Sequence, residues 1–349
     1  MADRWVSADE ATRFQHALLA AAAAAPSIPE LGTELSGRLN RFVPHNGYML
    51  AGLDPLTGVG CFHHKEHGYS VASAHRLEAD ESLGTEPHLF ADLMYGPGPV
   101  GVLSAGSSRY PRSVRSHDLM PAEGFGSEMR IALTHRGVPW GGLILLREHG
   151  SEGFSEAEAQ CAERLAEPMA IALRRYVAGK PLRPGRRGLS PGVVVIGPDD
   201  SIKGMTSTAR TWLREFVPES ARAKDEELTN LLWGMTYHTR RTNSTALSRI
   251  PTGEGWVAAH AQFLDGADGD ITITFQSAPA SLLLPAICAW YGLTPRERAI
   301  VEHLLGGLPT KHIARLLGMS PHTVAGHLRS LYRKTGTAGR EELIAGLRQ

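Results

Sequence analysis

The residues with the clearest chemical pattern lie at the C-terminal end of the chain, from Leu293 to Gln349. This segment holds nine Lys or Arg against four Asp or Glu, a formal charge of +5. Because the whole chain of 349 residues is formally neutral, residues 1–292 carry −5. A small basic unit on an acidic body indicates a partner that carries phosphates.

Helix-capping signals divide this basic segment into short helices. Thr294 with Glu297 three residues later is a capping box, and Thr310 and Ser320 are further candidate caps. Gly318 can adopt the left-handed backbone conformation that a tight turn between two helices requires. A fourth helix is expected from about Arg340 to Leu347, and its Leu343 and Leu347 are candidates for a dimer surface. Helix, tight turn and helix is the layout that places the second helix of the pair in a DNA major groove.

The same segment carries a run of residues that resembles the LuxR-type helix-turn-helix domain of bacterial transcription regulators. The run comprises Leu293-Thr294-x-Arg296-Glu297, Gly307-Leu308-x-x-Lys311-x-Ile313-Ala314-x-x-Leu317, Ser320-x-x-Thr323-Val324-x-x-His327-Leu328, Lys334-x-Gly336 and Arg340-x-Glu342-Leu343. The resemblance implies an all-α domain of four helices that binds DNA. The structural alternative is a helical bundle that serves dimerisation or docking.

The resemblance also implies roles for individual residues. The expected DNA-binding set is Thr310, Lys311, Ser320, His322, Thr323, Ala325, Gly326, His327, Arg329, Arg333 and Lys334. Thr310, Lys311 and Ser320 are expected near phosphates, and Thr323 and His327 are expected to position the third helix. Arg333 and Lys334 are also expected to touch phosphate.

Two positions of the third helix depart from the family pattern. The family often has Lys or Arg where this chain has Ala325, and an aliphatic residue that contacts bases where it has Gly326. Arg329 lies one turn further on and faces the same way, so we expect it to be the main base-reading residue, most naturally of a guanine. Gly326 costs about 1 kcal/mol of helix propensity. Either close approach to DNA or a tolerated surface glycine explains it.

The N-terminal part predicts an α+β domain. Its expected elements are two helices within 8–41, strands at 47–53, 59–63, 128–133 and 140–146, and a long helix that starts after Ser155 and runs towards Tyr176. Over about residues 10–177 this pattern resembles a GAF domain. The resemblance implies that a small ligand binds between sheet and loops, or that terminal helices dimerise. Tyr48 and Trp140 lie on predicted sheet faces and are the candidate ligand-binding residues.

The middle of the chain predicts a second α+β domain. Strands are expected at 193–196, 202–205, 246–250, 255–264 and 271–275, with a helix at 208–216. This pattern resembles a PAS-like fold. The chain is therefore expected to be multidomain, with these parts: a GAF-like sensor domain at 1–178, a linker at 179–190, a PAS-like domain at 191–278, a connector at 279–292 and the helix-turn-helix domain at 293–349.

Other clusters indicate no chemistry that the sequence supports. The stretch from Gly96 to Gly101 matches G-x-G-x-x-G, but its prolines predict a loop. Cys61, His63, His64 and His67 do not converge on one strand face, so solvent-facing histidines are expected rather than a metal site. The acidic stretch 265–270 lacks the spacing of a calcium loop. No catalytic signature is present, so we expect no enzyme, no metal and no cofactor other than an unidentified small-molecule ligand.

The resemblances together imply a bacterial transcription regulator that binds double-stranded promoter DNA as a homodimer. RNA polymerase is a further candidate partner. A cytoplasmic location is expected, because the three cysteines show no paired spacing and the N-terminus lacks an export or membrane signal. One alternative is a constitutive regulator whose sensory-type domains only dimerise or bind protein partners. Another is a ligand-binding enzyme that uses the helical end for assembly.

Overall fold

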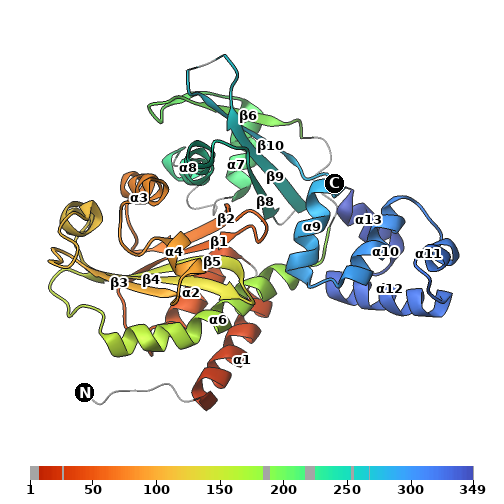
Figure 1. Cartoon of the computed structure of the whole chain (residues 1–349), viewed down its shortest axis with the longest axis horizontal. Coiled ribbons are helices and arrows are strands. Elements are labelled where there is room, and N and C mark those ends of the chain that lie inside the picture. Colours follow the sequence, from red (N-terminus) through yellow and green to blue (C-terminus); the bar gives the residue numbers. More distant parts are fainter. Residues whose placement is uncertain are drawn as a thin grey trace.

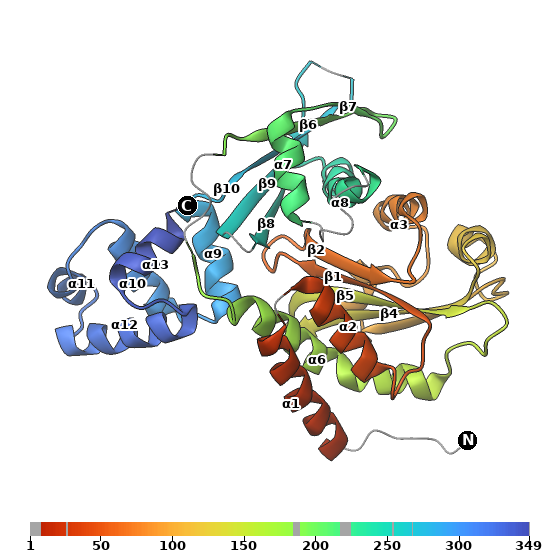
Figure 2. The same cartoon turned by 180° about the vertical axis from the view of Figure 1, so that it is seen from behind.

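The computed structural model describes residues 8–25, 27–183, 189–216, 225–252, 255–266 and 268–348. Two antiparallel five-stranded sheets, each with its own helices, precede a helical C-terminal unit (Figures 1 and 2). The expected multidomain architecture is therefore confirmed. Residues 184–188 of the expected linker and residue 267 of the acidic stretch lie outside the described residues.

The first sheet has the strand order β2-β1-β5-β4-β3. Its strands are β1 (Gly47–Leu53), β2 (Gly60–Glu66), β3 (Val100–Ser104), β4 (Phe125–His135) and β5 (Val138–Glu148). β1 pairs with β5 in a register that opposes Met49 to Ile144. The sequence predicted four of these strands and missed β3, because an edge strand of five residues is defined by its pairing with β4 rather than by a long pattern of its own.

Helices cover both faces of the first sheet. They are α1 (Ala8–Ala24), α2 (Ile28–Leu39), α3 (Val71–Leu83), α4 (Phe90–Tyr95), the π-helix η1 (Arg115–Leu119), α5 (Met120–Ala122) and α6 (Glu156–Ala178). α6 begins with the capping box that Ser155 and Glu158 predict. Successive side chains of a strand point to opposite faces. Tyr48 therefore packs in the core on the face of α2 and α6, whereas Met49 packs on the face of α3 and α4.

The second sheet has the order β7-β6-β10-β9-β8, so both sheets place their strands in the order second, first, fifth, fourth, third. Its elements are β6 (Gly192–Ile196), β7 (Ile202–Met205), α7 (Ser207–Phe216), α8 (Asp225–Thr242), β8 (Ala246–Thr252), β9 (Gly255–Phe263) and β10 (Ile271–Ser277). All five strands and α7 were predicted. α8 was not predicted from the sequence, and it packs against α3 of the first domain.

The helical C-terminal unit follows a connector helix. Its elements are α9 (Ala280–Tyr291), α10 (Pro295–Leu305), α11 (Thr310–Leu316), α12 (Pro321–Thr335) and α13 (Arg340–Leu347). Thr294 and Glu297 form the expected capping box, and Ser320 accepts a hydrogen bond from the Thr323 main-chain nitrogen at 3.0 Å. Gly318 has a φ of +64°, as the turn between α11 and α12 requires. Thr310 does not cap α11, because the N-cap position is Pro309.

The two sheet domains are joined by polar contacts at the turn between β1 and β2. The Asp54 carboxylate and the Arg249 guanidinium of β8 form a buried ion pair of 2.7 Å. Thr57 Oγ1 donates to the Leu247 carbonyl oxygen, and Ser248 Oγ donates to the Gly60 carbonyl oxygen, both at 2.7 Å. These bonds fix the hairpin of one domain to the edge strand of the other.

Candidate DNA-binding face and interdomain cavity

Helix α12 presents an exposed polar face because its apolar residues are spaced to face inward. Val324, Leu328 and Leu331 are buried in the core of the helical unit. Of the predicted DNA-binding residues, Lys311, Ser320, His322, Thr323, Arg329 and Arg333 are exposed, and Thr310, Ala325, Gly326 and His327 are half-buried. The structure therefore places these side chains together on α11, α12 and the turn between them. Ala325 and Gly326 place no long side chain on this face.

Lys334 is the exception in the predicted set. Its Nζ donates to Glu297 Oε2 at 2.7 Å and to the Gly292 carbonyl oxygen at 2.9 Å. The lysine therefore ties α12 to the start of α10, and its charge is directed at protein rather than at phosphate. Burial raises the pKa of Glu297, but Lys334, the Thr294 amide and Ser330 together lower it to about 2.

The helical unit is docked on the first domain. Trp290 of α9 and Trp140 of β5 form an edge-to-face pair with ring centroids 4.8 Å apart. Arg174 of α6 donates to the Trp290 carbonyl oxygen at 3.1 Å. Leu182 donates its main-chain N–H to the Thr335 carbonyl oxygen at 2.9 Å, and its side chain is fully buried. The first residues of the expected solvated linker are therefore a strap packed against the helical unit.

This strap corrects a second expectation from the sequence. The fourth helix was expected to offer Leu343 and Leu347 to a dimer, but each side chain is only 1% exposed. A Cβ built at Gly346 would lie 2.8 Å from Leu182 Cγ, so α13 and the strap are in close contact. The apolar face of α13 is thus covered within the same chain.

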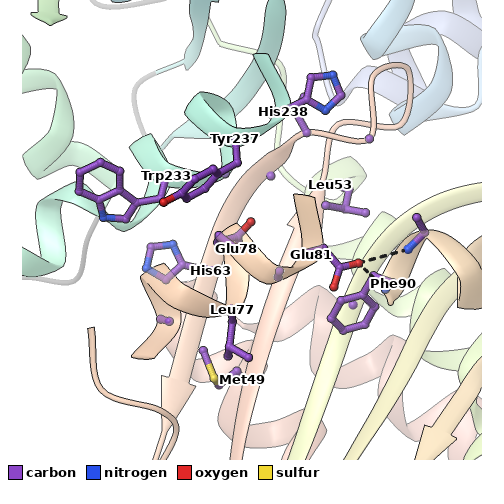
Figure 3. Close-up of a pocket in the computed structure, with 18 of the residues that line it drawn as sticks. Met49, Leu53, His63, Leu77, Glu78, Glu81, Phe90, Trp233, Tyr237 and His238 are labelled. Atoms are coloured by element: carbon purple, nitrogen blue, oxygen red, sulfur yellow. Dashed lines mark hydrogen bonds between the residues drawn. The ribbon is translucent and has the colours of Figure 1, made fainter. Parts of the chain in front are cut away.

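A cavity of about 340 Å³ lies between the first sheet, α3, α4 and α8 (Figure 3). Its apolar wall is formed by residues of both domains: Met49, Leu53, Phe62, Leu77, Phe90, Met94, Trp233 and Met235. Tyr95 also lines it and is 74% exposed, which marks the mouth at the end of α4. Its size is within the range of small-molecule sites, about 300–1,000 Å³.

Polar groups hold α3 and α8 together at one side of this cavity. The Tyr237 hydroxyl lies 2.8 Å from His75 Nε2, and the His75 ring lies 4.3 Å from the Trp233 ring. Tyr237 also donates to Asp200, which is ion-paired with Arg240. Burial lowers the pKa of His75, with Asp200 opposing and Arg240 reinforcing this effect. A neutral imidazole is therefore favoured in this contact.

A buried charge network supports the floor of the cavity. Glu128 Oε1 lies 3.2 Å from Arg115 Nε and 2.8 Å from Arg130 Nε, and the Tyr69 hydroxyl donates to Glu128 Oε2 at 2.7 Å. Burial raises the pKa of Glu128, but the two guanidinium groups and the Tyr69 hydroxyl outweigh it and lower the pKa. Arg130 Nη1 also pairs with Glu81 Oε2 at 2.8 Å, so two carboxylates compensate the charge of Arg130.

Tyr48 and Trp140, the expected ligand-binding residues, do not line this cavity. Tyr48 packs beside Gly32 of α2, and Trp140 packs against Trp290. Strand alternation placed both on the opposite face of the sheet. The residues that sequence analysis missed are Glu78, Glu81, Trp233, Tyr237 and His238. The sequence pattern that could have indicated the α3 residues is acidic side chains at helical spacing with apolar ones. The pattern for the α8 residues is an aromatic pair four residues apart.

The histidine-rich strand β2 divides between the two faces. His63 lines the cavity, and His64 lies beside Tyr48 with ring centroids 5.9 Å apart. Cys61 is fully buried, and burial raises its pKa. Within the described ranges, no group of three His, Cys, Asp or Glu side chains is arranged to hold a metal ion. Asp270 of the acidic stretch pairs instead with Lys203 at 2.7 Å. No helix in the described part of the chain is long and apolar enough to cross a membrane.

Comparison with known proteins identifies the C-terminal unit. Residues 292–346 match the luxR family of bacterial regulatory proteins. A helix-turn-helix-type transcriptional regulator of Mycobacterium bovis is 46% identical over 55 residues, and one of Mycobacterium tuberculosis H37Rv is 44% identical over 55 residues. Each match covers 16% of this chain and only 6% of the relative's length.

Two solved structures illustrate the more distant likenesses. Escherichia coli SdiA has a TM-score of 0.37 and 13% identity over 96% of this chain and 95% of that chain. The chromophore-binding domain of a Stigmatella aurantiaca bacteriophytochrome has a TM-score of 0.28 and 12% identity over 47% of this chain and 59% of that chain. The family match spans helices α10–α13, and residues 292–346 are therefore a helix-turn-helix domain of the luxR family.

Proposed function

We propose that this protein is a bacterial transcription regulator that binds promoter DNA through α12, as a homodimer, under the control of a small molecule in the interdomain cavity. The observation that carries the DNA-binding part is the exposed polar face of α11 and α12 within a luxR-type domain of formal charge +5. A helix of this kind reads a short half-site, and two copies read two half-sites.

Arg329 is the proposed base-reading residue and Lys311 a proposed phosphate contact. Arg329 is exposed on α12, and neither Ala325 nor Gly326 extends a long side chain in front of it. A Cβ at Gly326 would meet Arg329 Nη2 at 4.0 Å, so the guanidinium lies over the glycine and faces outward from the same turn. Arginine pairs with guanine through two parallel hydrogen bonds in the major groove. Lys311 is exposed at the start of α11, where a positive charge meets the DNA backbone.

DNA selection from a random pool, followed by binding isotherms over a range of salt concentrations, tests this assignment. Arg329→Ala should reduce discrimination between the selected and scrambled sites by about 1–3 kcal/mol. Lys311→Ala should weaken both sites alike and lower the slope of log K against log salt by about 1. Arg298→Ala, which removes an exposed arginine of α10, is the charge-matched control. Unchanged discrimination in Arg329→Ala would refute the base-reading role.

The ligand-control part is supported by the position of the cavity at the contact of two domains. α8 forms part of its wall and belongs to the second domain, whose β8 bears Arg249. Arg249 pairs with Asp54 and also donates from Nε to the Leu282 carbonyl oxygen in the first turn of α9. A ligand that favours one arrangement of α3 and α8 therefore acts on the connector to the DNA-binding unit. Such control requires different affinities for two arrangements.

Native and denaturing mass spectrometry of the purified protein tests for a bound small molecule and for the dimer. A mass released on denaturation supports the ligand. Operator affinity that stays constant when this molecule is removed would favour the constitutive alternative, in which the sheet domains only assemble or bind proteins. Operator affinity independent of half-site spacing would contradict the dimer.

A further inference from the structure

We propose that the cavity takes a small molecule with an apolar, ring-containing body and one cationic nitrogen, which pairs with the Glu78 carboxylate. This inference rests on the ligand-control part of the proposed function and names the ligand class. Glu78 belongs to α3 and points between the two domains (Figure 3). A cation at this position would contact α3 directly and α8 across the cavity.

The walls of the cavity favour an apolar ring system. Phe90 faces it from the first domain, and Trp233 faces it from α8. Leu77 and Met49 extend this wall between them. Aromatic walls of this kind bind the flat faces and edges of rings and also stabilise nearby cations. The volume of about 340 Å³ admits a bicyclic ring with a short side chain.

The charges around the cavity leave one carboxylate without a counter-charge. Glu81 accepts hydrogen bonds from Arg130 Nη1 at 2.8 Å and from the Phe90 main-chain nitrogen at 2.5 Å. Lys65 donates to the Tyr69 carbonyl oxygen at 2.8 Å. Among the described residues, Glu78 has no hydrogen-bond or ion-pair partner, and its side chain lines the cavity beside Gly234. An unpaired carboxylate in a largely apolar site selects a donor or a cation.

The described side chains of α8, the helix opposite Glu78, bring no partner to it. A Cβ built at Gly234 would lie only 3.5 Å from Glu78 Oε2, so the carboxylate faces the bare backbone of α8. His238 follows one turn later, and burial followed by Arg241 lowers its pKa. Burial also lowers the pKa of His63, to about 4, with Lys65 and His64 adding to the effect. Both imidazoles are therefore neutral near pH 7, and neither competes with a cationic ligand.

Arg241 and His64 are the remaining basic residues on the described lining, and burial lowers the pKa of His64. The Arg241 side chain is exposed. Burial, followed by the charge of Glu81, raises the pKa of Glu78 to about 7, with Arg130 opposing. The Glu78 carboxyl group is therefore partly protonated near neutrality. A bound cation favours the carboxylate, so its binding should release protons near pH 7.

Titration calorimetry on the full chain with three indoles tests the ligand class. Tryptamine is the cation, tryptophol the neutral alcohol and indole-3-acetate the anion on the same ring. We expect tryptamine to bind about 10- to 100-fold more tightly than tryptophol, because it makes a charge-assisted bond. Indole-3-acetate should bind most weakly. Tryptamine binding at pH 7 should also show a heat that depends on the ionisation enthalpy of the buffer, as proton release requires.

Glu78→Gln should abolish the preference for tryptamine over tryptophol and the buffer dependence. Glu163→Gln, an exposed glutamate of α6, is the matched control and should retain both. Tighter binding of the acid, a preference that survives in Glu78→Gln, or no tryptamine binding would overturn the proposal. Operator binding is measured separately, without indoles. Absence of operator binding would contradict the proposed function, but the proposed ligand class would stand. Failure of the indole series would contradict the ligand class, but the DNA-binding function would stand.

Discussion

Replacing Asp54 with alanine should destabilise the contact between the two sheet domains by about 3–5 kcal/mol, because it leaves a buried guanidinium without its carboxylate. Asp54 is 0% exposed and Arg249 is 6% exposed. Asp54 Oδ2 accepts hydrogen bonds from the Arg249 main-chain nitrogen at 3.0 Å and from Nη1 at 2.7 Å. Hydrogen bonds to charged groups contribute about 1.5–3 kcal/mol each, so these two bonds account for the expected loss.

A double-mutant cycle measures this pair. Asp54→Ala, Arg249→Met and the double variant are unfolded in urea, with circular dichroism and tryptophan fluorescence recorded in parallel. We expect the double variant to be more stable than the sum of the single losses predicts, with a coupling of at least about 2 kcal/mol. Loosening the domain contact should also separate the two transitions, because two-state behaviour is lost when domains unfold independently.

An exposed aspartate provides the control for this cycle. Asp265→Ala, on the loop after β9, should change the free energy of unfolding by no more than about 0.5 kcal/mol. If Asp54→Ala were as mild as Asp265→Ala, or if the coupling were near zero, then Asp54 and Arg249 would not be the joint between the domains. The proposed coupling between the cavity and the connector helix α9 would then lose the ion pair on which it depends.

Three further outcomes follow from the helical unit. The stability of this unit should fall as pH drops from about 4.5 towards 2, because the folded pKa of Glu297, at about 2, lies below its ordinary value. Thermal melts should show that Glu297→Gln makes the stability depend less on pH. Gly326→Ala should raise helix stability by up to about 1 kcal/mol, and a simultaneous loss of operator affinity would show that DNA approaches the helix there. Leu182→Ala should weaken docking of α13 by about 2–5 kcal/mol, seen as faster proteolysis of the strap, whereas unchanged proteolysis would contradict its role.

Local sequence signals predicted much of this fold because they act over a few residues. Thr294 and Glu297 form their capping box within one helical turn, as do Ser155 and Glu158. The luxR-type unit is recognisable for the same reason: caps, the turn at Gly318 and inward apolar residues all lie within a short segment. Alternating strands such as β1 were predicted in the same way.

Tertiary packing decided which side of each element does what. Alternation predicts that Tyr48 and Met49 face opposite sides, but only the positions of α2, α3 and α6 decide which side holds the cavity. The role of Lys334 likewise depends on Glu297, 37 residues away, because the Glu297 carboxylate pairs with the Lys334 ammonium group. Leu343 was expected at a dimer surface, but its side chain is only 1% exposed because it is covered within the same chain.

The sequence by itself determined a basic luxR-type helical unit behind two α+β domains, since caps, periodicity and charge are properties of neighbouring residues. Only the tertiary structure decided that Glu78 of α3 lies beside Gly234 of α8 on the lining of a cavity. It also decided that Asp54 pairs with Arg249. The physical reason is that a cavity and a buried ion pair arise where segments more than a hundred residues apart are brought into contact, and no local pattern encodes that contact.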